Sequence, residues 1–181
     1  MKQVVCPKCK CEFGTFCLRA QAHCPKCDNI FAIEIQKPSV PNYDIIGTVT
    51  LTSIQQGLIE AGKGFNGAHV QESEIHPLLM GMATRHANYQ ALHNTQGHQL
   101  FQQRVTELQQ TMGQYVYAEI VAESWVRQVN DTPLELGTEM FRCWEKSSGH
   151  WSVASKKHKY FGADMAKGKS GVWYACVLVA D

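Results

Sequence analysis

The chain has 181 residues, of which 44% are hydrophobic and only 18% are charged, and its formal net charge is +1. This length fits one small module plus one domain large enough to bury a hydrophobic core. The near-zero charge provides no strong field of the kind that attracts nucleic acids or membranes, and no apolar run reaches the ~18 residues of a membrane-spanning helix.

The first residues bear on the compartment in which the protein folds. Met1-Lys2-Gln3-Val4-Val5 leads directly into a cysteine pair, without the apolar segment of a signal peptide. We therefore expect synthesis and folding in the reducing cytoplasm, with no membrane association. Cys143 and Cys176 each lie alone in apolar surroundings, a setting typical of buried thiols.

Two C-x-x-C motifs dominate the N-terminal segment: Cys6-Pro7-Lys8-Cys9 and, after 14 residues, Cys24-Pro25-Lys26-Cys27. Each motif offers two thiolates from one tight turn, and two such turns close a tetrahedron around Zn²⁺ without an open position. We predict one structural zinc ion per chain, and its expected ligands are Cys6, Cys9, Cys24 and Cys27. A redox dithiol or disulfides are the alternatives, and Cys11 is a competing ligand with poorer geometry.

Short strands are expected on either side of the cysteine motifs, at Val4-Val5 and from Ile30 to Ile33. Residues 1–36 resemble the short zinc ribbons at the N-termini of many bacterial and phage proteins. A segment this short buries too little apolar surface to fold alone, so the metal must supply the folding energy. Residues 37–43 are a predicted linker, because Pro38 and Pro41 keep the chain extended. Residues 44–181 are expected to form the second domain.

The second domain begins with a segment that the sequence does not resolve. Residues 45–51 fit either a strand or the start of a helix, and the glycines from Gly57 to Gly67 predict a loop-rich region after it. Gly57 to Gly64 nearly matches a phosphate-binding P-loop. It lacks the Ser or Thr that would follow Lys63 and hold Mg²⁺, so we do not expect nucleotide binding there.

Two helices are predicted next. Pro77 marks the start of the first, which continues to about Asn94 and carries a stripe of spaced side chains: Leu79, Met82, His86, Tyr89 and His93. Gly97 interrupts the chain. The second helix places His98 in its first turn, and its expected buried face consists of Phe101, Val105, Leu108 and Met112.

The rest of the domain combines a further helix with a buried strand. Glu119 and Glu123 are spaced to share one face if residues 115–125 are helical. Thr132-Pro133-Leu134-Glu135 is a capping box that predicts a helix ending near Ser147 to His150. The pattern of Val172 to Ala180 predicts a central strand buried on both faces. Helices packed on a small sheet give an α+β fold, an αβα sandwich.

Four segments then occur in an order and at spacings that resemble the CAP superfamily of cysteine-rich secretory, antigen 5 and pathogenesis-related proteins, in its short bacterial branch. The segments are Gly97-His98, Glu119-Ile120-Val121-Ala122, Trp144-Glu145-Lys146-Ser147-Ser148-Gly149-His150 and Phe161-Gly162-Ala163-Asp164-Met165. Arg104 follows His98 where the family has an arginine, whereas Ile120 and Ala118 replace the usual asparagine and glycine. The resemblance covers residues 76–180 and implies a CAP-like αβα sandwich.

The resemblance also implies a site. In this family conserved histidines and glutamates meet in a cleft that binds a divalent metal in some members. Carried over, these positions are His98, Glu119 and His150, with Glu123 as a fourth group or as a partner that orients the others. Imidazole nitrogens and a carboxylate suit Zn²⁺ with an open position, which would give a second metal besides the ribbon zinc. Two plainer interpretations stay open: His150 caps a helix end, and Glu119 is a satisfied polar group beside His98.

Three functions follow from these observations. The favoured one is a non-catalytic binding or structural module, in which a CAP-like scaffold is tethered by the ribbon to a protein assembly such as a phage particle. No H-E-x-x-H motif and no nucleophile elbow is present, and we assign no catalytic residue. The alternatives are a metal-dependent hydrolase that uses the His/Glu cleft and a nucleic-acid-binding protein that uses the ribbon, helped by Lys156, Lys157, Lys159, Lys167 and Lys169.

The zinc site gives the first testable prediction. A Cys9→Ser/Cys27→Ser variant should contain one zinc ion fewer per chain than the native protein and should lose the fold of residues 1–36 alone, because only that segment depends on the metal. Elemental analysis combined with heteronuclear NMR spectra of the full chain measures both effects. Native protein that lacks zinc and shows Cys6 or Cys24 in a disulfide by mass spectrometry would contradict the prediction.

Overall fold

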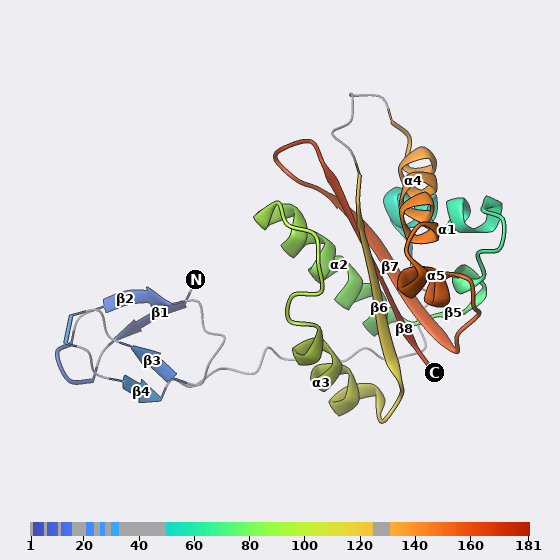
Figure 1. Cartoon of the computed structure of the whole chain (residues 1–181). Coiled ribbons are helices and arrows are strands. Elements are labelled where there is room, and N and C mark those ends of the chain that lie inside the picture. Colours follow the sequence, from blue (N-terminus) through green and yellow to red (C-terminus); the bar gives the residue numbers. More distant parts are fainter. Residues whose placement is uncertain are drawn as a thin grey trace. The chain divides into compact units, whose positions relative to one another are not determined.

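The computed structural model describes residues 2–5, 7–10, 12–15, 21–23, 26–27, 30–32, 50–124 and 131–181. The chain divides into two units, Met1–Tyr43 and Asp44–Asp181 (Figure 1). The predicted linker, residues 37–43, lies outside the described residues. Within the described ranges, no helix has both the length and the apolar character needed to cross a bilayer.

The N-terminal unit contains two small antiparallel sheets. Strand β1 (Lys2–Val5) pairs with β2 (Glu12–Thr15), and β3 (Gln21–His23) pairs with β4 (Ile30–Ala32). The strands expected next to the cysteine motifs are thus present as β1 and β4. Cys9 and Cys27 are half-buried and each lies in a turn. Cys6 and Cys24 lie outside the described residues, so the zinc site stays a prediction.

The second unit is built on a four-stranded mixed sheet with the strand order β5-β7-β8-β6. These strands are β5 (Glu74–Ile75), β7 (Tyr160–Lys167), β8 (Trp173–Ala180) and β6 (Tyr117–Glu123). β8 pairs antiparallel with both neighbours, whereas β5 runs parallel to β7. The central strand expected near residues 172–180 is confirmed as β8. Residues 117–123 are a strand, not a helix, because they complete the ladder beside β8.

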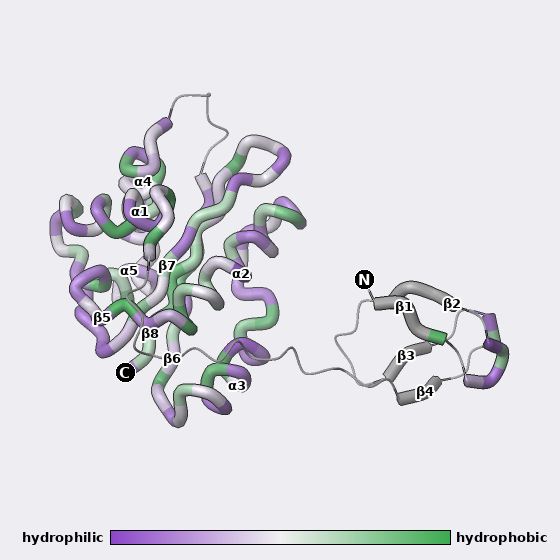
Figure 2. The backbone as a smooth tube through the Cα atoms, turned by 180° about the vertical axis from the view of Figure 1, so that it is seen from behind, coloured by the Kyte–Doolittle hydropathy of each residue, from purple (hydrophilic) through white to green (hydrophobic). Residues whose placement is uncertain are grey.

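Helices cover both faces of this sheet (Figure 1), so the fold is α+β. On one face, α1 (Ser53–Gly64), α4 (Pro133–Glu145) and α5 (Ser148–Ala154) share a core with Val177 of β8. On the other, α2 (Pro77–His93) and α3 (Phe101–Met112) pack with Leu178. In Figure 2 the hydrophobic colour runs along the paired strands, while the helices alternate in colour as amphipathic helices do.

The glycine-rich segment after residue 53 is helical, which corrects the loop expected there. Thr52 and Gln55 form a capping box that starts α1. Two of its glycines lie against α4: a Cβ atom on Gly57 would come within 2.3 Å of Pro133 Cβ, and one on Gly62 within 2.7 Å of the Phe141 ring. Close helix contact therefore explains Gly57 and Gly62. The segment is not a P-loop, since helical hydrogen bonds occupy the backbone N–H groups that would cradle a phosphate.

The capping box predicted at Thr132 and Glu135 is confirmed, and α4 begins at Pro133. α4 ends at Glu145, and a separate short helix, α5, follows from Ser148. His150 therefore lies in the first turn of α5. The interpretation of His150 as a cap at a helix C-terminus is wrong, because the chain turns and starts a new helix before it.

Helix α2 follows the predicted bounds and starts with an unusual cap. His76 Nδ1 accepts a hydrogen bond from the Leu78 N–H at 3.2 Å. This nitrogen can accept only while it is unprotonated. Burial lowers the pKa of His76, against an opposing effect of the Glu74 carboxylate. Neutral His76 therefore stabilises the folded chain.

This cap predicts a pH dependence. As the pH falls below about 6.5, the ordinary pKa of histidine, the unfolded chain takes up a proton at residue 76 more readily than the folded chain does, so the free energy of unfolding decreases. His76→Asn keeps a side-chain acceptor at the N-cap but does not titrate. Its stability, measured by urea denaturation, should decrease less than that of the native protein between about pH 7.5 and pH 5. Identical decreases would rule out this role of His76.

Candidate functional site

His98 lies in the loop between α2 and α3, and not in the first helical turn where it was expected. The helix begins only at Phe101. In this loop φ is positive at Asn94 (48°), Gly97 (149°) and Leu100 (61°). A left-handed conformation costs a residue such as leucine roughly 1–2 kcal/mol. Tertiary contacts, rather than local preference, therefore set the shape of the loop.

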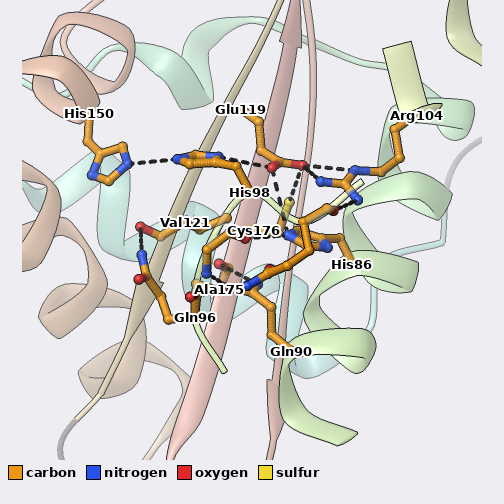
Figure 3. Close-up of polar contacts among 12 residues, drawn as sticks. His86, Gln90, Gln96, His98, Arg104, Glu119, Val121, His150, Ala175 and Cys176 are labelled. Carbon is orange, nitrogen blue, oxygen red and sulfur yellow. Dashed lines mark hydrogen bonds and ion pairs between the residues drawn. The ribbon is translucent and has the colours of Figure 1, made fainter. Parts of the chain in front are cut away.

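An ion pair buried between α3 and β6 lies next to His98, on the side away from His150 (Figure 3). Arg104 Nε and Nη2 donate to Glu119 Oε2 at 3.0 and 2.5 Å. The Glu119 side chain is 0% exposed and that of Arg104 is 5% exposed. Arg104 Nη1 also donates to the Gln99 carbonyl at 2.7 Å. The guanidinium group thus neutralises the carboxylate and holds the loop at the same time.

The second oxygen of Glu119 orients His98. The distance from Oε1 to His98 Nδ1 is 3.0 Å. Because the Glu119 carboxylate accepts here, His98 Nδ1 carries a proton, and Nε2 lies on the opposite side of the ring, away from Glu119. The His98 side chain is 46% exposed. His98 therefore presents an imidazole nitrogen to solvent.

That nitrogen faces a second imidazole. His98 Nε2 and His150 Nε2 lie 3.4 Å apart, and the two rings are tilted by 45° (Figure 3). Burial, and to a smaller extent the charge of His98, lowers the pKa of His150. We call His98 and His150 the histidine pair. It joins the α2–α3 loop to the first turn of α5.

The structure brings His98, Glu119 and His150 together, but as a row and not around one centre. Glu119 contacts His98 from the interior, and His150 contacts it from the solvent side. Glu123 is exposed at the end of β6, and its charge raises the pKa of the nearby Cys143 thiol, an effect smaller than that of burial. Within the described part of the chain, no group of three or more His, Cys, Asp and Glu side chains is arranged to hold a metal ion.

Two buried polar residues lie behind the site. Sequence reasoning placed the first, His86, on the stripe of α2 without assigning it a role, and it missed the second, Gln90. Both lie in α2 and are 1% and 0% exposed. A usable signal was present: the two residues lie one helical turn apart on the buried stripe of α2, and buried polar groups need hydrogen-bond partners. Their partner proves to be the loop that carries His98.

The lysines expected to assist nucleic-acid binding lie near the two ends of one strand. Lys156, Lys157 and Lys159 precede β7, whereas Lys167 ends it and Lys169 follows. At about 3.3 Å per residue, the strand holds the two groups on the order of 20 Å apart. The five lysines therefore lie in two groups at the two ends of β7, and nucleic-acid binding stays a prediction.

No family model and no curated protein matches the chain. Among solved structures, an outer surface protein from Borrelia burgdorferi aligns with a TM-score of 0.49 and 19% sequence identity, over 71% of this chain and 89% of that one.

The buried ion pair gives a prediction for stability. Arg104→Met should lower the free energy of unfolding by about 3–5 kcal/mol, because it leaves the Glu119 carboxylate buried without its cation. Adding Glu119→Gln to this variant removes the charge and should restore part of the loss. Urea denaturation of the single and double variants measures both effects. A loss below about 1 kcal/mol for Arg104→Met, the value of an exposed pair, would contradict the burial of this interaction.

Proposed function

We propose that the chain is a binding scaffold without catalytic activity. In this proposal a CAP-like domain, residues 44–181, is joined to a zinc ribbon, residues 1–36, which attaches it to a larger protein assembly such as a phage particle. The arrangement of helices on both faces of the sheet, with His98 in contact with both Glu119 and His150, agrees with the CAP resemblance. The resembled family has no common reaction, so the choice between binding and catalysis rests on the geometry of the site.

The observation that carries the proposal is the engagement of Glu119. A carboxylate that acts as a general base or as an open metal ligand must reach a substrate, a water molecule or the metal. Both oxygens of Glu119 are instead bound inside the protein, one by Arg104 and one by His98. Catalytic zinc sites have three protein ligands. Among the residues that the structure describes, only two imidazole nitrogens converge here, because the expected third ligand, Glu119, faces the Arg104 guanidinium.

A second candidate function, a metal-dependent hydrolase, is favoured by the spacing of the histidine pair. Two ligands of a tetrahedral zinc ion at 2.0–2.1 Å lie roughly 3.3–3.4 Å from each other, and the two Nε2 atoms lie 3.4 Å apart. The bond from His98 Nδ1 to Glu119 is of the kind that orients metal-bound histidines. A substrate or water molecules would have to complete such a site.

Metal content separates the two candidates. For the scaffold, the native full-length chain and a His98→Ala/His150→Ala variant should both contain one zinc ion, that of the ribbon, and neither should hydrolyse nitrophenyl esters or phosphate esters. For the hydrolase, the native chain should contain two metal ions and the variant one, with loss of hydrolysis and an unchanged circular dichroism spectrum. Finding this second pattern would overturn the scaffold proposal.

The tether has its own test. The full-length chain from its natural source should elute with a high-molecular-mass assembly in size-exclusion chromatography, and the Cys9→Ser/Cys27→Ser variant should elute alone, since the ribbon makes the attachment. A His150→Ala variant is the matched control and should stay with the assembly. A native chain that elutes alone, or a cysteine variant that still co-elutes, would contradict attachment through the ribbon.

A further inference from the structure

The backbone of Gly97, in the α2–α3 loop, is held at both of its polar atoms by side chains from α2. The Gly97 N–H donates to Gln90 Oε1 at 3.1 Å, and the Gly97 carbonyl lies 2.8 Å from His86 Nε2 (Figure 3). Residues 86 and 90 are one helical turn apart and therefore lie one above the other on the same face of α2. Gly97 directly precedes His98.

The two side chains are themselves fixed. Gln90 is 0% exposed, and its Nε2 donates to the Ala175 carbonyl of β8 at 3.4 Å, so this amide is held between the sheet and the loop. His86 is 1% exposed, and its ring stacks on that of Tyr89 at 6.0 Å. Burial and these contacts hold both side chains in place in the close-packed interior.

The contact with Gly97 also determines the protonation of His86. A carbonyl oxygen only accepts hydrogen bonds, so His86 Nε2 must carry the proton. Among the described residues His86 Nδ1 is buried and has no hydrogen-bond partner. Burial lowers the pKa of His86, while the facing charges of Glu119 and Arg104 act in opposite directions. A neutral ring with its proton on Nε2 satisfies these contacts.

We propose that His86 is a positioning residue of the histidine pair: by donating to the Gly97 carbonyl, with Gln90 holding the N–H of the same residue, it fixes the backbone so that His98 meets Glu119 through Nδ1 and His150 through Nε2. The role is independent of which candidate function is right, because it concerns the geometry of the pair and not what the pair binds. The positive φ of Gly97 and Leu100 agrees with a loop whose shape is imposed from α2.

The first test needs no mutation. In long-range ¹H–¹⁵N spectra of the full-length native protein above about pH 7, where histidine is largely neutral, His86 should show a protonated Nε2 and an unprotonated Nδ1, and His98 the reverse. Neutral His86 with its proton on Nδ1 would overturn the proposal, because Nε2 could then not donate to the Gly97 carbonyl.

The second test uses a matched pair of variants. His86→Gln places an amide donor near the position of Nε2, whereas His86→Met has a similar length and no donor. In His86→Met, His98 should populate both neutral tautomers, and the Gly97 amide should exchange its hydrogen roughly tenfold faster. His86→Gln should keep the native pattern at both residues.

A merely structural role would give a different outcome: both variants would lose stability to a similar extent, and His98 would keep its native tautomer in each. A folded His86→Met protein with native spectra at His98 and Gly97 would overturn the proposal. If circular dichroism shows that His86→Met does not fold, Gln90→Met removes the hydrogen bond to the Gly97 N–H instead, and the His98 tautomer and the Gly97 amide exchange are measured in that variant. If neither variant folds, the tautomer of His86 in the native protein decides the test.

Discussion

The buried pair of Arg104 and Glu119 is the interaction on which the candidate site depends. Helix α3 fully buries only Arg104 and Leu108, while Phe101 and Met112 pack half-buried against the same core, so the charged contact and a narrow apolar face together anchor it to the sheet. An ion pair removed from water is tolerated when its remaining hydrogen-bonding atoms are also satisfied. In this pair, Arg104 Nη1 bonds to the Gln99 carbonyl and Glu119 Oε1 bonds to His98. One hydrogen-bond network thereby connects helix α3, the α2–α3 loop and the edge strand β6.

Local sequence signals predicted those elements whose cause is local. The capping box at Thr132, the proline that opens α2 and the apolar run of β8 each specify structure within a few residues. Gly57 and Gly62 of α1 were misread because a glycine that avoids a clash with a neighbouring helix looks the same in sequence as one that bends a loop. Glu119 and Glu123 were ambiguous because residues four apart share a face in a strand as well as in a helix.

The sequence predicted which residues meet at the site, but it did not predict how they are arranged. The CAP resemblance selects His98, Glu119 and His150, and the structure places them in contact. Spacing cannot show whether a carboxylate faces an open cleft or an arginine from the next helix, and that difference separates the candidate functions. The role of His86 and Gln90 depends on where the α2–α3 loop packs against α2. This is a tertiary contact, and no local sequence pattern indicates it.

The position of β6 at the sheet edge has a consequence for the solution behaviour of the protein. Its outward carbonyls at Val121 and Glu123 are met by the Gln96 amide and the Cys143 thiol, at 3.5 and 3.8 Å. An uncovered edge strand is a template on which other chains add strands. The loop that displays His98 therefore also shields the sheet, and remodelling it to alter what the histidine pair binds would open a surface for intermolecular β-sheet growth.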